Sequence, residues 1–258
     1  EMCIRDRIYL GCYMSIPKKN SRTLEEKYKM PMGKRSKTLQ GASLVLEEIE
    51  PLTQNQIGAF DSEKHLVLHG VAGTGKTFIS CYLAFDDMIK NIFEKLVIIR
   101  SAVPTRDIGF HPGSEKEKAS VYEEPYKDIA IELFSRGDAY QVLTTKGLVH
   151  FMTTSFIRGV TLRDAVILID ECQNMSFHEL DSIITRVGEN CRVIFCGDFQ
   201  QADLKQNGLK SFLRILDKMG SFDLIEFDVT DIVRSGFVKD YILAKQQIEG
   251  IYGGNPCQ

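Results

Sequence analysis

The chain has 258 residues, of which 43% are hydrophobic and 26% are charged, and its formal net charge is −3 at pH 7. This composition fits a soluble enzyme with one sizeable core, and it allows one domain or one domain plus a tail. No apolar stretch approaches the roughly 20 residues of a membrane-spanning helix, and no signal peptide is expected. The seven cysteines lack C-x-x-C spacing, which argues against a disulfide framework or a zinc site and indicates reduced thiols in a cytoplasmic protein.

Charge is distributed unevenly along the chain. Residues 1–40 contain ten Lys or Arg and four Asp or Glu, a net charge of +6, so the remaining residues carry −9. We expect residues 1–43 to form a disordered basic arm, because this segment lacks hydrophobic periodicity. Its start, from Glu1 to Arg7, resembles a cloning leader. Two interpretations of the arm are equally open: it contacts nucleic-acid phosphates, or it is a solvated tail that aids solubility.

From residue 44 on, apolar runs alternate with amphipathic stretches. The expected elements are helix 54–60, strand 66–68, helix 78–88, strand 96–99, helix 126–134, strand 148–153, strand 165–169, helix 176–187, strand 192–195, helix 209–219, strand 224–227 and helix 237–248. Residues 106–120 are rich in glycine, proline and charge and are expected to form a loop. This alternation predicts an α/β domain over residues 44–250, mostly a parallel sheet with helices on both faces. Residues 251–258 would then be a C-terminal tail.

The most informative motif is Gly70-Val71-Ala72-Gly73-Thr74-Gly75-Lys76-Thr77. It matches the Walker A pattern G-x-x-x-x-G-K-[ST], with a strand-like run before it and a helix-like stretch after it. The glycines allow backbone N–H groups to surround a polyphosphate at a helix N-terminus. Lys76 is expected to reach the β- and γ-phosphates, and the Thr77 hydroxyl to hold Mg²⁺. The flanking pattern disfavours the alternative of a chance glycine-rich turn.

A second motif indicates hydrolysis as well as binding. The apolar run 165–169 ends in Asp170 and Glu171, about 90 residues after the Walker A motif. Such a run is typical of a strand buried on both faces of a parallel sheet, and its carboxyl end lies at the edge where ligands bind. We expect Asp170 to contact the Mg²⁺ shell and Glu171 to act as the general base. Two solvated acids at a strand end are the alternative.

Two glutamines extend the candidate site. Gln201 lies in a G-D-x-x-Q sequence after the strand 192–195, the position of helicase motif III, where a glutamine can sense the γ-phosphate. Gln56 lies in a stretch that resembles the Q-motif of superfamily 1 helicases, and it would read the adenine edge. The alternative for Gln56 is an ordinary residue on a helix surface.

Taken together, these segments resemble the PhoH-like family, the phosphate-starvation ATPases of bacteria and many phages. The matching segments are GVAGTGKT at 70–77, RSAVPTRDIGFHPG at 100–113, IRGVTL at 157–162, ILIDECQN at 167–174, CGDFQQAD at 196–203 and DIVRSGFV at 231–238. They occur in the family's order and span residues from about 50 to 250. The resemblance implies a single RecA-like P-loop NTPase domain, with ATP as substrate and RNA as partner.

Three departures from the family pattern stand out. Cys172 replaces the usual alanine inside the Asp-Glu-x-Gln-Asn element, a small-for-small change that should be neutral. Thr105-Arg106-Asp107 stands where a Gly-Glu pair is often found, and Ser235 replaces the usual histidine. The last change leaves Arg234 intact but puts any role of that histidine in doubt.

Arg234 is the candidate arginine finger or sensor, acting within its own subunit or across an interface in a homo-oligomeric ring. The alternative is a salt bridge with Asp228 or Asp231. Arg158 is a second candidate for the same role. Gln173 and Asn174 are expected to link the Walker B strand to the motif III loop, with helix capping near Ser176 as the alternative.

The expected function is Mg²⁺-dependent ATP hydrolysis, coupled to binding or unwinding of RNA or single-stranded DNA. The alternative is a nucleotide-gated switch that binds a protein partner without helicase activity. Glu171 and Gln201 favour hydrolysis over the switch. A small-molecule kinase is a weaker third class, because no lid segment is evident. The length leaves too little chain for a second full core, so motor action would need another subunit.

Overall fold

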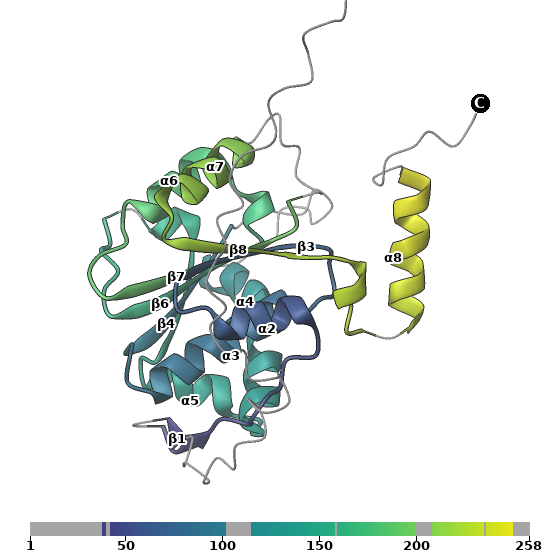
Figure 1. The fold of residues 1–258 in the computed structure, drawn as a ribbon. Helices are drawn as coiled ribbons and strands as arrows, with labels where there is room; N and C mark the ends of the chain where they lie inside the picture. The colour runs from purple at the N-terminus through teal and green to yellow at the C-terminus, as the bar shows by residue number, and fades with distance from the viewer. Residues whose placement is uncertain are drawn as a thin grey trace, which may run out of the picture. The chain divides into compact units, whose positions relative to one another are not determined.

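Six apolar runs form one sheet, in which every neighbouring pair of strands is parallel (Figure 1). The strands are β3 (His65–Gly70), β4 (Lys95–Arg100), β5 (Val149–Thr153), β6 (Ala165–Asp170), β7 (Cys191–Gly197) and β8 (Phe222–Phe227), and their order is β5-β4-β6-β7-β3-β8. All six residues of β6 are buried. Continuous apolar runs suit these strands because helices cover both faces of a parallel sheet.

The computed structural model describes residues 38–39, 42–101, 115–157, 159–199, 208–234 and 236–249. The chain divides into two units, Glu1–Ser36 and Lys37–Gln258, and every described residue belongs to the second. A small antiparallel pair, β1 (Thr38–Leu39) with β2 (Leu44–Val45), precedes the main sheet in the sequence.

The helices are α2 (Gln54–Asp61), α3 (Lys76–Ile89), α4 (Glu115–Phe134), α5 (Ala139–Thr145), α6 (Phe177–Ile184), α7 (Leu209–Met219) and α8 (Gly236–Glu249). Three short 3₁₀ helices are η1 (Thr154–Phe156), η2 (Cys172–Asn174) and η3 (Val229–Asp231). Figure 1 shows α2, α3, α4 and α5 on one side of the sheet and α6 and α7 on the other. None of the helices among these described residues is long and apolar enough to cross a membrane.

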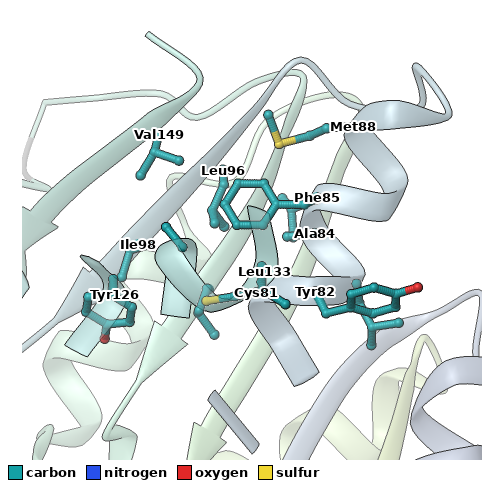
Figure 2. Close-up of a cluster of buried hydrophobic side chains, with 14 of the residues drawn as sticks. Cys81, Tyr82, Ala84, Phe85, Met88, Leu96, Ile98, Tyr126, Leu133 and Val149 are labelled. Atoms are coloured by element: carbon teal, nitrogen blue, oxygen red, sulfur yellow. The ribbon is translucent and has the colours of Figure 1, made fainter. Parts of the chain in front are cut away.

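Two apolar cores lie on the two faces of the sheet. Leu66 and Leu68 of β3 belong to the core under α3, α4 and α5, whereas Val67 belongs to the core under α6 and α7. Successive residues of a strand point to opposite faces, so one strand supplies both cores. Figure 2 shows part of the first core, in which Phe85 and Met88 of α3 lie near Leu96 of β4. The helices are therefore held in place by burial on both faces of the sheet.

The structure confirms the expected α/β domain with a mostly parallel sheet, and each expected strand is present. One expectation was wrong in part: residues 115–120 belong to α4, although the segment 106–120 was expected to be a loop, and residues 102–114 lie outside the described part of the chain. Charged residues and Pro125 hide the helical period of α4 in the sequence. Helix α5 was not expected, because its seven residues are too few to show a period.

Candidate nucleotide-binding site

The Walker A residues form the turn between β3, which ends at Gly70, and α3, which begins at Lys76. Gly70 has φ +116°, and a Cβ atom there would lie 2.0 Å from the carbonyl oxygen of Phe227 in β8. Gly73 and Gly75 also have positive φ, at +81° and +83°. Residues with a side chain rarely adopt a positive φ, so the turn needs glycine at these three positions. At Gly70 a side chain would also collide with the backbone of β8. The result is a loop that curls around the N-terminus of α3, which is the usual binding site for a phosphate.

Lys76 lies across the centre of this loop. Its Nζ donates hydrogen bonds to the carbonyl oxygens of Gly70 at 3.0 Å and Val71 at 2.6 Å, and to the Thr74 hydroxyl at 3.3 Å. Thr74 is fully buried and its hydroxyl donates to the Val71 carbonyl. Burial lowers the pKa of Lys76, while the acids around it, Asp170 among them, oppose that shift. The lysine therefore places a positive charge where the loop would receive a polyphosphate.

Thr77 and Asp170 join the two nucleotide-binding motifs. The Thr77 hydroxyl donates to Oδ1 of Asp170 at 3.0 Å, although the residues are 93 positions apart in the sequence. The other carboxylate oxygen, Oδ2, accepts a hydrogen bond from the Tyr126 hydroxyl at 2.7 Å. Burial raises the pKa of Asp170, and the hydrogen bond from Tyr126 opposes that shift. A hydroxyl and a carboxylate at this spacing are the oxygen donors that Mg²⁺ prefers, so these two residues fit the ion.

Glu171 follows β6 with the left-handed backbone φ of +53°. Its carboxylate contacts Arg100 at the end of β4, with Nη2 3.8 Å from Oε1, and it accepts a hydrogen bond at Oε2 from the Gln173 amide. The side-chain amide oxygen of Gln173, Oε1, in turn accepts a hydrogen bond from the backbone N–H of Asp198 at 3.1 Å. Gln173 thus links Glu171 to the chain after β7, as expected from the sequence. The side chain of Asn174 is exposed, and its backbone N–H bonds to the Glu171 carbonyl.

These residues line one cavity of about 920 Å³ at the carboxyl edge of the sheet. Ligands of open α/β sheets bind at this edge. The expected site residues on its wall are Gln56, Ala72, Gly73, Gly75, Lys76, Thr77, Asp170, Glu171 and Arg234. The structure therefore brings together residues from α2, the Walker A loop, the end of β6 and the segment after η3.

Gln56 lies on the wall of the cavity, but both ends of its amide already have partners. Its Oε1 accepts a hydrogen bond from the Leu52 backbone N–H at 2.7 Å, and its Nε2 donates to the Thr74 carbonyl at 3.4 Å. The residue is buried, unlike an ordinary residue on a helix surface. In this arrangement Gln56 supports the Walker A loop, and its amide keeps a second N–H and a second lone pair with which it could contact adenine.

Arg234 lies beside the Walker A loop of its own chain, with Cδ 3.4 Å from where a Cβ atom on Gly73 would be. Among the described residues no ion pair joins Arg234 to Asp228 or Asp231. The carboxylate of Asp231 accepts hydrogen bonds from Asn55 and from the Asp228 backbone. Two other candidates, Gln201 and Arg158, lie outside the described residues.

Two residues of the site were missed by sequence reasoning. Arg100 contacts Glu171, and its guanidinium lies 5.8 Å from the ring centre of Tyr122. Tyr126, from the same helix as Tyr122, contacts Asp170. The position of Arg100 at the carboxyl end of an apolar run was a usable signal, because neighbouring parallel strands end at the same edge. Nothing in the sequence distinguishes Tyr126 from an ordinary core residue.

Known proteins with similar sequences belong to one family. The family described as "PhoH-like protein" matches residues 35–246 of the chain. The chain belongs to the PhoH-like family. A PhoH-like protein of Bacillus subtilis is 31% identical over 251 residues, which cover 95% of this chain and 75% of the relative. The protein PhoH of Escherichia coli K12 is 30% identical over 182 residues, 69% of this chain and 51% of that protein. The chain thus spans about half to three quarters of these PhoH-like relatives.

The fold is similar to that of a bacteriophage protein of known structure. The large terminase of the thermophilic bacteriophage D6E, whose structure contains ADP, superposes with a TM-score of 0.51. The match covers 79% of this chain and 51% of the terminase, at 15% sequence identity. At that identity the similarity supports the fold alone: this PhoH-like chain has the α/β architecture of a P-loop ATPase domain.

Proposed function

We propose that this PhoH-like protein hydrolyses ATP in the cavity between the Walker A loop and the end of β6. The observation that carries the proposal is the hydrogen bond between Thr77 and Asp170. It connects the phosphate-binding loop to the strand that ends in the two acids, so that Lys76 and Glu171 face one cavity. A P-loop protein needs this combination to bind a nucleotide and to cleave it.

Each residue has a separate task in this proposal. The backbone N–H groups of the loop and the Lys76 ammonium bind the β- and γ-phosphates and stabilise the charge that develops during transfer. Thr77 and Asp170 would hold Mg²⁺, which neutralises charge on the phosphate oxygens. Glu171 orients and deprotonates the attacking water, and the hydrogen bond from Gln173 fixes its carboxylate.

Arg234 completes the charge distribution around the γ-phosphate. Its place beside Gly73 supports a role within its own subunit. An arginine that contacts the transferred phosphoryl group contributes about 10³–10⁵ in rate in other P-loop enzymes. Gln201, by its position in motif III, would report the presence of the γ-phosphate.

We further propose that ATP turnover depends on RNA or single-stranded DNA. The basic segment 1–40, with its net charge of +6, supports contact with a phosphate backbone. Unwinding by this ATPase domain would use movement against another copy of the domain, for example in a ring. The competing function is a nucleotide-gated switch that binds a protein partner, and Glu171 favours hydrolysis over it because a switch needs no general base.

Steady-state ATP hydrolysis, measured with and without single-stranded RNA and single-stranded DNA, tests the proposal. The matched blank is Glu171→Gln, which keeps the size of the side chain and removes the base. Hydrolysis that one nucleic acid stimulates, and that the variant lacks, supports a nucleic-acid-dependent ATPase. Tight ATP binding with slow turnover that neither nucleic acid changes would favour the switch.

A further inference from the structure

We infer that helix α4 is part of the metal site, and that Tyr126 is a positioning residue that orients the Asp170 carboxylate for Mg²⁺·ATP. The inference rests on the proposed function, because it assigns a task in that same site. Tyr126 lies 44 residues before Asp170 and belongs to neither Walker motif. Tyr126 reaches Asp170 because helix α4 packs against the sheet.

The apolar core fixes the position of the tyrosine ring. Tyr126 is 2% exposed, and its ring packs against Phe151 of β5 with a centroid distance of 5.8 Å. Figure 2 shows Tyr126 at one side of the core, near Ile98 of β4. A buried tyrosine needs a partner for its hydroxyl, and here that partner is Oδ2 of Asp170 at 2.7 Å. The hydroxyl is therefore held in one place by packing around the ring.

The two oxygens of Asp170 are bonded to different elements. Oδ1 accepts the hydrogen bond of Thr77 from α3, and Oδ2 accepts that of Tyr126 from α4. Two bonds, one to each oxygen and each from a different helix, fix the rotation of the carboxylate, which a single bond would leave free. Asp170 is 5% exposed, so water has little access to replace either partner. The oxygen that faces Thr77 thus stays aimed at the place where the metal and the phosphates would meet.

Helix α4 also reaches the second acid. Tyr122, one helical turn before Tyr126, lies under the guanidinium of Arg100 at 5.8 Å, and Arg100 contacts Glu171. Residues four apart share one face of a helix, so a single face of α4 supports both Asp170 and Glu171. This second contact is independent of the first and makes α4 a wall of the active site.

A residue that supports a metal ligand changes the affinity for the metal. Loss of such a partner reduces metal affinity or activity by about 10–100-fold in known metal sites. The predicted effect is therefore on the part of nucleotide binding that depends on Mg²⁺. Binding of the nucleotide without metal depends on the Walker A loop, and among the described residues no hydrogen bond joins Tyr126 to that loop.

The test measures binding of a fluorescent ATP analogue, mant-ATP, in Mg²⁺ and again in EDTA. The dissociation constant in EDTA divided by that in Mg²⁺ gives the contribution of the metal to binding. The variant is Tyr126→Phe, which keeps the ring and removes the hydroxyl. The matched control is Tyr140→Phe in α5, a buried tyrosine whose hydroxyl donates to the carboxylate of Glu123 and not to that of Asp170.

We expect Tyr126→Phe to reduce the ratio by about tenfold or more and to leave binding in EDTA unchanged. Tyr140→Phe should leave both values unchanged. Equal weakening in Mg²⁺ and in EDTA, or no change in either, would overturn the role of Tyr126. If the unaltered protein bound no mant-ATP in either solution, the proposed function itself would fail. Reversible partial unfolding of the variant would raise the dissociation constants in Mg²⁺ and in EDTA by the same factor, so their ratio would not change.

Discussion

The guanidinium-bearing side chain of Arg234 lies against Gly73 of its own chain, with Cδ 3.4 Å from the site of a Cβ atom on that glycine. We predict that Arg234→Ala lowers kcat for ATP hydrolysis by about 10³, because the charge that stabilises the transferring phosphoryl group is lost. KM for ATP should change little, since the loop and Lys76 bind the ground state. Steady-state kinetics measures both values. Arg214→Ala in α7, an exposed arginine, is the control; a decrease below about tenfold would contradict the assignment.

The same contact predicts that Arg234 acts within one subunit. A mixture of Arg234→Ala and Glu171→Gln proteins should then show no more ATPase activity than the two variants measured apart. If Arg234 acted across an interface, mixed assemblies would contain some sites with both an intact base and an intact arginine. Activity regained on mixing would therefore show that the arginine works between subunits.

Gly70 is expected to tolerate no side chain. A Cβ atom there would lie 2.0 Å from the Phe227 carbonyl oxygen, and φ is +116°. We predict that Gly70→Ala lowers the free energy of unfolding by about 3 kcal/mol or more, because backbone must move in both β3 and β8. Urea unfolding measures the change. Gly137→Ala is the matched control, because a Cβ atom at Gly137 meets nothing within 4 Å.

Gln173 is expected to affect turnover more than binding. The Gln173→Ala variant loses both the bond to Glu171 and the bond from the Asp198 backbone. We predict that kcat decreases by about 10–100-fold, part of the 10²–10⁴ that a general base contributes, while KM stays near its original value. Asn174→Ala removes an exposed amide from the next residue and should leave kcat unchanged. An equal effect of the two substitutions would argue against the link.

Stability should decrease in mild acid. His65 accepts a hydrogen bond from the Val193 backbone N–H at Nδ1, at 3.1 Å, and this bond requires an unprotonated nitrogen. Burial, assisted by the charge of Arg192, lowers the pKa of His65 from its usual 6.5. Below that pH the unfolded chain therefore binds more protons than the folded chain. We predict that the free energy of unfolding falls as pH decreases from 7 to 5.

Urea unfolding across this pH range measures the dependence, which has a limiting slope of about 1.4 kcal/mol per pH unit for each proton. His65→Gln should weaken the dependence. It should not abolish it, because burial also lowers the pKa of His69. His178→Gln, at an exposed position, is the control. A dependence that His65→Gln leaves unaltered would refute the role of His65.

The strands and the two Walker motifs were predictable because each depends on local sequence. A buried parallel strand appears as a continuous apolar run, and the loop that binds phosphate needs glycines at fixed positions. Gln173, placed between Glu171 and the motif III segment, was also foreseen. The strands and the Walker motifs share one property: the residues that define each of them lie close together in the chain.

The features that were missed depend on contacts between distant segments. Residues 126–134 of α4 were expected to be helical, but the start of this helix at Glu115 was missed, because its charged first turns and Pro125 give no apolar period. The role of Tyr126 follows from the docking of that helix, which the sequence does not reveal. The adenine contact of Gln56 stays a prediction, but the bonds of its amide to Leu52 and Thr74, which join α2 to the Walker A loop, were not foreseen.

Strand β7 lies between β3, which leads into the phosphate-binding loop, and β6, which leads to the two acids. At its carboxyl end, a Cβ atom on Gly197 would lie 2.6 Å from the Cys172 thiol and 2.6 Å from the Gln173 amide oxygen. This junction has no spare volume, so a displacement of the chain after β7 must push on the segment that carries Glu171. A displacement at that one point would therefore reach both halves of the nucleotide site simultaneously.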